Sequence, residues 1–162
     1  MTNNDILIRL RYAFDIKDSD MVTIFKLGGS TVTKDEVQNM LIKVYEDEEV
    51  PAQFIACNNK TLEAFLNGFI TFKRGAQPGK PVPEATGKEA PNNMLLKKTK
   101  IALALTTEDV IEILHDGGIN VSKGELGALL RNPTHRNYKE CGDSFARNYL
   151  RGLTNRYRHP EG

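Results

Sequence analysis

Val32-Thr33-Lys34-Asp35-Glu36-Val37 decides how this chain folds, because the stretch combines three features of a helix start. Thr33 is placed to cap the free backbone N–H groups of the next turn, and Glu36 is placed to accept a hydrogen bond from the Thr33 backbone. Val32 and Val37 occupy the two positions of a hydrophobic staple. The stretch follows Gly28-Gly29, which predicts the end of a preceding helix because glycine adopts the left-handed conformation without strain.

The same pattern returns 89 residues later as Val121-Ser122-Lys123-Gly124-Glu125-Leu126, again after a double glycine, Gly117-Gly118. Apolar residues at helical spacing on both sides of each copy predict four helices in each half. We therefore predict an all-α fold made of two tandem four-helix repeats related by internal duplication. The repeats form either two separate bundles or one pseudo-symmetric body, and the wide apolar stripe on each fourth helix favours contact between the halves.

Residues 76–91 separate the two halves and are rich in proline and glycine. This segment contains Pro78, Gly79, Pro81, Pro83, Gly87 and Pro91. Such a composition predicts an extended, partly polyproline-like linker at a domain boundary. The predicted domains are thus a first repeat at 1–75, a linker at 76–91 and a second repeat at 92–162.

Composition places the chain among ordinary globular proteins, with 40% apolar and 27% charged residues in a length of 162. The net charge of +1 gives no overall attraction to nucleic acid or to an anionic membrane. The first repeat has 9 Lys/Arg and 11 Asp/Glu, whereas the second has 11 and 8. Two cysteines, with neither an apolar run of membrane-spanning length nor a signal-peptide pattern, predict a cytoplasmic protein that does not contact a membrane.

Several motifs of the first half resemble a known bacterial family. They are Asn3-Asn4, the Gly-Gly turn with its Val-Thr and capping Glu, and Ala56-Cys57…Ala64-Phe65-Leu66-Asn67-Gly68…Lys73-Arg74-Gly75. Together they are similar to the YehS-like proteins, known as domain of unknown function 1456, in which such a domain typically occurs twice. The second half departs from the pattern where Asn155-Arg156-Tyr157 replaces Thr71-Phe72-Lys73. The resemblance implies a duplicated helical domain in the bacterial cytoplasm and implies no catalytic residues.

No residue pattern in the chain favours catalysis. The spacing of Thr33 and Glu36, repeated in the second half, is that of a capping box and not of a hydroxyl–carboxylate active site. Cys57 and Cys141 each precede one of the predicted fourth helices. Such a cysteine is either a thiolate activated by the helix N-terminus or a small buried apolar residue, and we favour the second interpretation. Without C-x-x-C, H-E-x-x-H or a glycine-rich phosphate loop, we predict no enzyme, no cofactor and no metal.

Gly68 and Gly152 lie inside the two predicted fourth helices, where glycine costs about 1 kcal/mol relative to alanine. A cost that occurs twice indicates a shared structural reason. We expect another helix backbone to approach closely at each glycine, across a pseudo-twofold axis. A small-molecule pocket between the repeats, beside these glycines, is a weaker hypothesis.

The last helix carries the clearest candidate binding surface, because Arg147, Arg151, Asn155 and Arg158 recur at i, i+4, i+8 and i+11 on one face. The full candidate surface consists of Arg147, Arg151, Asn155, Arg156, Tyr157, Arg158 and two helix-start lysines, Lys34 and Lys123. Arginines beside a tyrosine suit phosphate binding and base stacking. They equally suit pairing with the acidic residues 46–49, within the chain or across a homodimer.

Two hypotheses follow from this surface. The first is a small interaction or regulatory module without catalytic activity, acting on an unknown protein partner. The alternative is a nucleic-acid-binding protein that uses the basic face of the last helix. A helix-turn-helix interpretation is weaker, because the predicted third helix exposes Asp35 and Glu36, which phosphates would repel.

Overall fold

The structure is a computed structural model that describes residues 1–158. Within that range the chain forms eight α-helices and no strand, which confirms the all-α prediction. The helices are α1 (Asn3–Phe14), α2 (Asp18–Leu27), α3 (Lys34–Met40), α4 (Asn59–Arg74), α5 (Pro91–Ala102), α6 (Thr107–Asp116), α7 (Lys123–Leu130) and α8 (Asp143–Tyr157). The last four residues of the predicted second repeat, 159–162, lie outside the described residues. No helix in residues 1–158 has the length and apolar character needed to cross a membrane.

The predicted capping boxes are confirmed at the starts of α3 and α7. The Thr33 hydroxyl accepts a hydrogen bond from the backbone N–H of Glu36 at 3.1 Å, and the Glu36 carboxylate accepts one from the backbone N–H of Thr33 at 2.9 Å. Ser122 and Glu125 exchange the corresponding bonds. Both pairs therefore satisfy backbone groups of a helix end.

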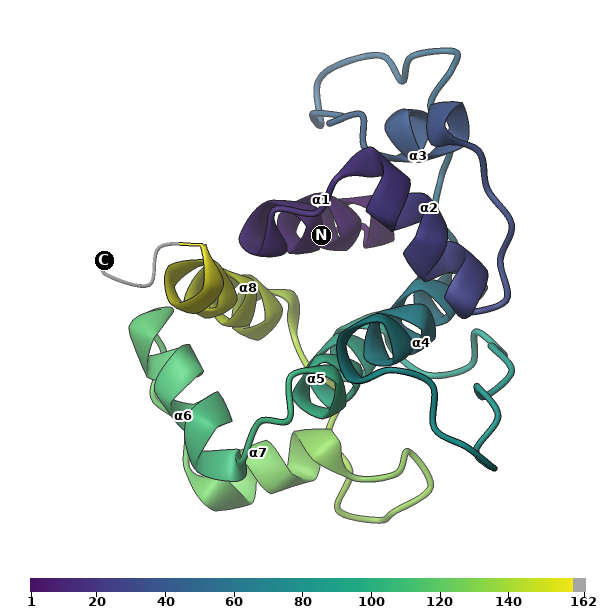
Figure 1. Cartoon of the computed structure of the whole chain (residues 1–162). Coiled ribbons are helices and arrows are strands. Elements are labelled where there is room, and N and C mark those ends of the chain that lie inside the picture. The colour runs from purple at the N-terminus through teal and green to yellow at the C-terminus, as the bar shows by residue number, and fades with distance from the viewer. Residues whose placement is uncertain (159–162) are drawn as a thin grey trace.

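The two halves pack as one body, because the last helix of each half contacts the first helix of the other half. Figure 1 shows α4 between α2 and α5, and α8 between α6 and α1. Buried apolar side chains from all eight helices meet in a single cluster. Among the sequence-based alternatives, the structure thus supports one body over two separate bundles.

The glycines inside α4 and α8 make the predicted close contacts, but not across the interface between the halves. A Cβ atom on Gly68 would lie 1.8 Å from the backbone oxygen of Ile24 in α2, and one on Gly152 would lie 2.0 Å from that of Ile113 in α6. The expected approach across a pseudo-twofold axis was therefore wrong. Each glycine instead lets two helices of the same half cross at backbone contact.

The two glycines of the Gly28-Gly29 pair have different roles. A Cβ on Gly28 would lie 1.7 Å from the backbone oxygen of Ala64, so Gly28 completes the α2–α4 contact from the other side. Its φ of −86° is not left-handed. Gly29, with φ +90° and open space around it, makes the left-handed turn that sequence analysis assigned to the pair.

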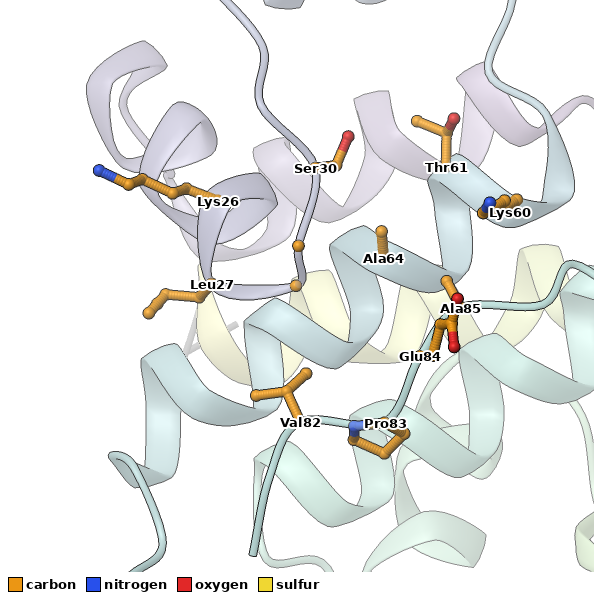
Figure 2. A pocket seen from close by; sticks show the side chains of 12 residues that line it. Lys26, Leu27, Ser30, Lys60, Thr61, Ala64, Val82, Pro83, Glu84 and Ala85 are labelled. Atoms are coloured by element: carbon orange, nitrogen blue, oxygen red, sulfur yellow. The ribbon is translucent and has the colours of Figure 1, made fainter.

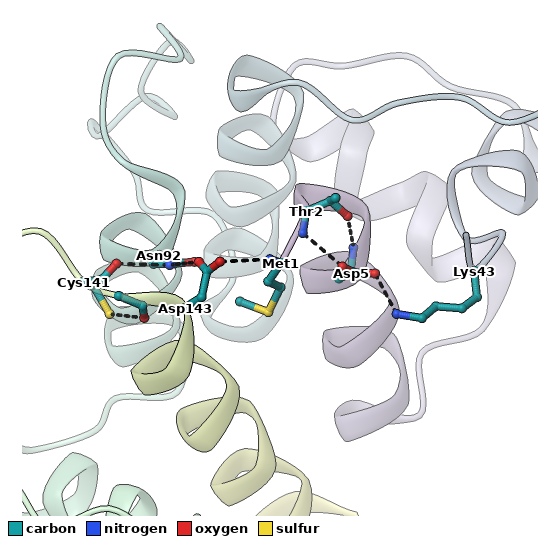
Figure 3. Close-up of polar contacts among 8 residues, drawn as sticks. Met1, Thr2, Asp5, Lys43, Asn92, Cys141 and Asp143 are labelled. Carbon is teal, nitrogen blue, oxygen red and sulfur yellow. Dashed lines mark hydrogen bonds and ion pairs between the residues drawn. The ribbon is translucent and has the colours of Figure 1, made fainter. Parts of the chain in front are cut away.

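A polar cluster joins the starts of α1, α5 and α8 (Figure 3). The amino group of Met1 contacts the Asp143 carboxylate at 2.9 Å, and the side-chain amide of Asn92 donates to the same carboxylate at 2.8 Å. The hydrogen bond from the Met1 amino group is the main cause that lowers the pKa of Asp143. This cluster ties the first residue of the chain to the last helix.

The segment between α4 and α5 contains neither helix nor strand, and it is attached to α4. The side-chain amide of Asn67 donates to the backbone oxygen of Pro83 at 3.2 Å, and the Glu63 carboxylate accepts hydrogen bonds from Thr86 and Gly87. Figure 2 shows Val82, Pro83, Glu84 and Ala85 running beside the part of α4 that contains Ala64. The segment ends one residue earlier than predicted, because Pro91 is the first residue of α5.

Candidate binding groove between the first and last helices

The predicted continuous basic face of α8 is divided in the structure, because its C-terminal part faces two different neighbours. The Asn155 side chain donates to the backbone oxygen of Asp116 at 3.2 Å, and Arg156 forms an ion pair of 3.5 Å with Asp109. Asn155 and Arg156 thus contact α6. Tyr157 and Arg158, which follow them, contact α1.

Arg158 contacts the C-terminal end of α1 instead of projecting into solvent. Its guanidinium donates to the backbone oxygen of Tyr12 at 2.8 Å, pairs with Asp15 at 3.3 Å and stacks over the Tyr12 ring at 4.0 Å. The ring of Tyr157 packs against that of Phe14, with centroids 5.0 Å apart. A cation at the end of a helix also complements the helix dipole. Arg158 and Tyr157 therefore hold the two halves together.

The two lysines of the predicted surface lie far from each other. Figure 1 shows α3, which begins with Lys34, and α7, which begins with Lys123, at opposite ends of the molecule. Lys123 forms an ion pair of 2.8 Å with Glu108, and Lys34 is exposed. The predicted eight-residue surface is thus not one site.

Arg147 and Arg151 remain exposed on α8, and α1 supplies the rest of a groove beside them. The groove has a volume of about 400 Å³ and is lined by Asp5, Ile8, Arg9, Tyr12, Lys43, Leu150, Arg151 and Thr154. Neither Arg9 nor Arg151 forms an ion pair with any side chain in residues 1–158. The Tyr12 side chain is 49% exposed at the same place.

The carboxylate that lines this groove, Asp5, already forms an ion pair. Lys43 contacts Asp5 at 3.0 Å. Partial burial pushes the pKa of Asp5 up, but hydrogen bonds from the Thr2 backbone and from Lys43 outweigh it and hold the pKa below its ordinary value. The groove therefore presents the charges of Arg9 and Arg151 without a competing carboxylate.

Arg9 and Tyr12 were not among the predicted site residues, because the predicted arginine face lay within the last helix alone. Both residues lie on the side of α1 opposite the buried stripe of Ile6, Leu10 and Ala13. An arginine and a tyrosine three residues apart on a polar face are a usable signal. Only the packing of α1 against α8 joins that signal to Arg151.

The two cysteines are buried structural residues at the entries of α4 and α8. Burial raises the pKa of the Cys57 thiol to about 12, and burial together with the charge of Asp143 raises that of Cys141 to about 12. A thiolate is the reactive form of cysteine, and neither residue supplies one near neutral pH. Within the described part of the chain, no three His, Cys, Asp or Glu side chains are grouped so that they could hold a metal ion.

We expect both native thiols to resist a disulfide reagent at pH 8 and to react fully after unfolding in urea. Above about pH 9, where an unfolded cysteine loses its proton, the native thiols still hold theirs, so the free energy of unfolding falls as the pH rises towards 12. Thiol titration by absorbance measures the first effect. A Cys57→Ala/Cys141→Ala variant, measured by urea unfolding at pH 8 and 10, should show a smaller loss at high pH. Fast labelling of the native protein would contradict this assignment.

Comparison with known proteins places the chain in a family. The family described as protein of unknown function (DUF1456) matches residues 3–75 and again residues 92–159. The uncharacterized protein YehS of Escherichia coli (strain K12) is 40% identical over 162 residues, which covers the full length of both chains. No solved structure matches the chain. The chain belongs to the DUF1456 family, as its motifs indicated.

Proposed function

We propose that this member of the DUF1456 family is a non-catalytic interaction module that binds an acidic segment of a partner protein along the groove between α1 and α8. The observation that carries the proposal is the pair Arg9 and Arg151, exposed on both walls of the groove and without a carboxylate partner in residues 1–158. Arginine binds carboxylates through two parallel hydrogen bonds, which gives geometric specificity. Tyr12 adds an exposed aromatic surface between them.

An acidic peptide fits this groove better than a nucleic acid does. Nucleic-acid affinity grows with the number of phosphates that cations neutralise. Arg156 and Arg158 are engaged with Asp109 and Asp15, which leaves few arginines for a phosphate backbone. A short acidic segment needs only the local charges of Arg9 and Arg151.

The absence of catalysis is part of the proposal and rests on the roles of the reactive groups. The two Thr/Ser–Glu pairs hold helix ends through backbone hydrogen bonds. Both thiols are buried with raised pKa values. Hydroxyls, carboxylates and thiols are the first candidates for a nucleophile or a base. In this protein these groups have structural roles instead.

We also propose that the two halves arose by duplication and act as repeats at 1–75 and 92–162, joined by 76–91. The two separate family matches support this, and so do contacts that recur in each half. Arg74 donates to the backbone oxygen of Ile101 as Arg158 does to that of Tyr12. The free cysteines and the bacterial relative support a cytoplasmic location.

Fluorescence anisotropy with a labelled Glu/Asp-rich peptide containing one aromatic residue tests the proposed groove. We expect binding in the micromolar range at low salt, and at least a tenfold loss in an Arg9→Glu/Arg151→Glu variant, because two favourable charge contacts become repulsive. Lys26→Glu/Lys34→Glu is the matched control, since it makes the same charge change at exposed lysines outside the groove. The control should bind as the native protein does.

Three other outcomes would reject this function. If the peptide does not bind at low salt, or if both variants lose affinity equally, the groove is not the site. If single-stranded RNA or duplex DNA binds more tightly than the peptide, with an affinity that falls steeply with salt and depends on Arg147 and Arg151, the protein is a nucleic-acid binder instead.

A further inference from the structure

A second hollow, away from the α1–α8 groove, lies between the end of α4, the linker and α5. Its volume is about 600 Å³, within the range of small-molecule sites. It is lined by Asn67, Ile70, Thr71, Arg74, Gly75, Ala76, Gln77, Lys80, Pro81, Val82, Pro83, Lys98 and Ile101. Apolar side chains from α4, the linker and α5 form its walls. The linker thus covers one side of a groove between the two helices.

The charged residues around this hollow are all cations. Arg74, Lys80 and Lys98 line it, and no aspartate or glutamate does. None of the three cations forms an ion pair with a side chain in the described range 1–158. Lys98 is half-buried, so its charge is less screened by solvent than that of a fully exposed lysine. The charge of the hollow complements an anion.

Asn67 supplies a second, independent sign of a ligand. Its side chain is 2% exposed, and its amide nitrogen donates to the backbone oxygen of Pro83. Its Oδ1 atom is buried and accepts no hydrogen bond from any group in residues 1–158. A buried acceptor without a donor costs about 1–3 kcal/mol, which a donor on a bound molecule would recover.

We propose that the hollow binds a small organic carboxylate with an apolar body and one hydrogen-bond donor. Lys98 and Arg74 hold the carboxylate, Ile70, Val82 and Ile101 enclose the apolar body, and Asn67 Oδ1 accepts the donor. Arg74 can bind the carboxylate while it keeps its hydrogen bond to the backbone oxygen of Ile101, because a guanidinium carries five N–H donors.

The corresponding groove between α1 and α8 is lined by different side chains. Arg151 there occupies the position of Asn67, and Arg9 that of Lys98. No linker crosses that groove within the described chain, so it is open to a longer partner. The two sites are separate, and this inference does not depend on the proposed peptide binding.

Calorimetric titration with indole-3-propionate tests the site, because this probe combines a carboxylate, an apolar ring and an N–H donor. We expect micromolar binding, and no binding of tryptamine, in which an ammonium group replaces the carboxylate. Lys98→Glu should weaken binding at least tenfold. Arg9→Glu, the same charge reversal at the corresponding place in the other groove, should leave it unchanged.

The role of Asn67 is tested with 1-methylindole-3-propionate, which lacks the N–H donor. The native protein should bind it about tenfold more weakly than indole-3-propionate. In Asn67→Ala the two probes should bind equally, even if the linker loosens and both affinities drop. The proposal fails if indole-3-propionate does not bind at millimolar concentration, if Lys98→Glu binds it normally, or if Arg9→Glu weakens it instead. Peptide binding by Lys98→Glu, measured in parallel, separates failure here from failure of the proposed function.

Discussion

Gly68→Ala should destabilise the protein by about 3 kcal/mol or more, a large effect for the addition of one methyl group. The new Cβ would lie 1.8 Å from the backbone oxygen of Ile24 and 2.9 Å from its carbonyl carbon. Both obstacles are backbone, so no side chain can rotate away, and α2 and α4 must separate. The separation would open the core around Phe25 and Phe65, which pack edge to face at 5.0 Å. Urea unfolding followed by far-ultraviolet circular dichroism measures the loss.

Gly127→Ala in α7 is the matched control. This glycine is also inside a helix, but apart from its chain neighbours and the backbone of its own helix no atom lies within 4 Å of the position that its Cβ would take. Alanine is the better helix former, so the control should be more stable by about 0.5–1 kcal/mol. Opposite signs for the same substitution in two helices would establish that backbone contact, and not helix propensity, decides at Gly68. An unchanged or higher stability of Gly68→Ala would show that α2 and α4 do not approach so closely.

The features that sequence analysis predicted well are those fixed by neighbours in the chain. A capping box is complete within four residues, so Thr33 and Glu36 were sufficient to place the start of α3. Proline and glycine content likewise indicated the end of α4 and the start of α5 to within one residue. Gly68 was recognised as a site of close approach, but its partner was misplaced, because helical periodicity does not say which helix covers which face.

The candidate site was harder to predict for the same reason. Arg156 and Arg158 look like part of an open basic face when α8 is read alone. Their engagement with Asp109 and Asp15 depends on α6 and α1 lying on either side of α8. Arg9 comes into the groove from a helix more than 140 residues earlier in the chain than Arg151. No local spacing rule joins residues so far apart.

The same limit applies to Asn93, a buried asparagine for which the sequence predicted no role. The Asn93 side chain is completely buried, and its amide donates to the backbone oxygens of Leu129 and Lys139, each at 3.0 Å. Its oxygen accepts from the backbone N–H of Cys141 at 2.8 Å. One side chain thus joins α5 to the end of α7 and the entry of α8. Asn4 makes the corresponding three bonds in the first half.

Asn93→Asp should therefore cost about 3–5 kcal/mol at neutral pH, because it places a buried charge against two carbonyl oxygens. Burial and those oxygens both raise the pKa of the new carboxyl above its unfolded value of about 4. The folded state then holds its proton more tightly, so the loss is smallest below pH 4 and grows as the pH rises towards 7. Urea unfolding at a series of pH values measures the trend against the native protein.

Asn93→Leu separates the charge from the lost hydrogen bonds, since leucine has a similar size and no titratable group. It leaves two carbonyl oxygens and the Cys141 N–H without their partner, which should cost about 3 kcal/mol or more. That loss should be the same at pH 4 and pH 7. A pH-independent Asn93→Asp would mean that the side chain reaches solvent, and the polar junction of α5, α7 and α8 would then not be the closed one described above. A steep pH dependence confined to the aspartate variant would establish that the stability of this junction needs both the donor and the acceptor of Asn93 in one buried place.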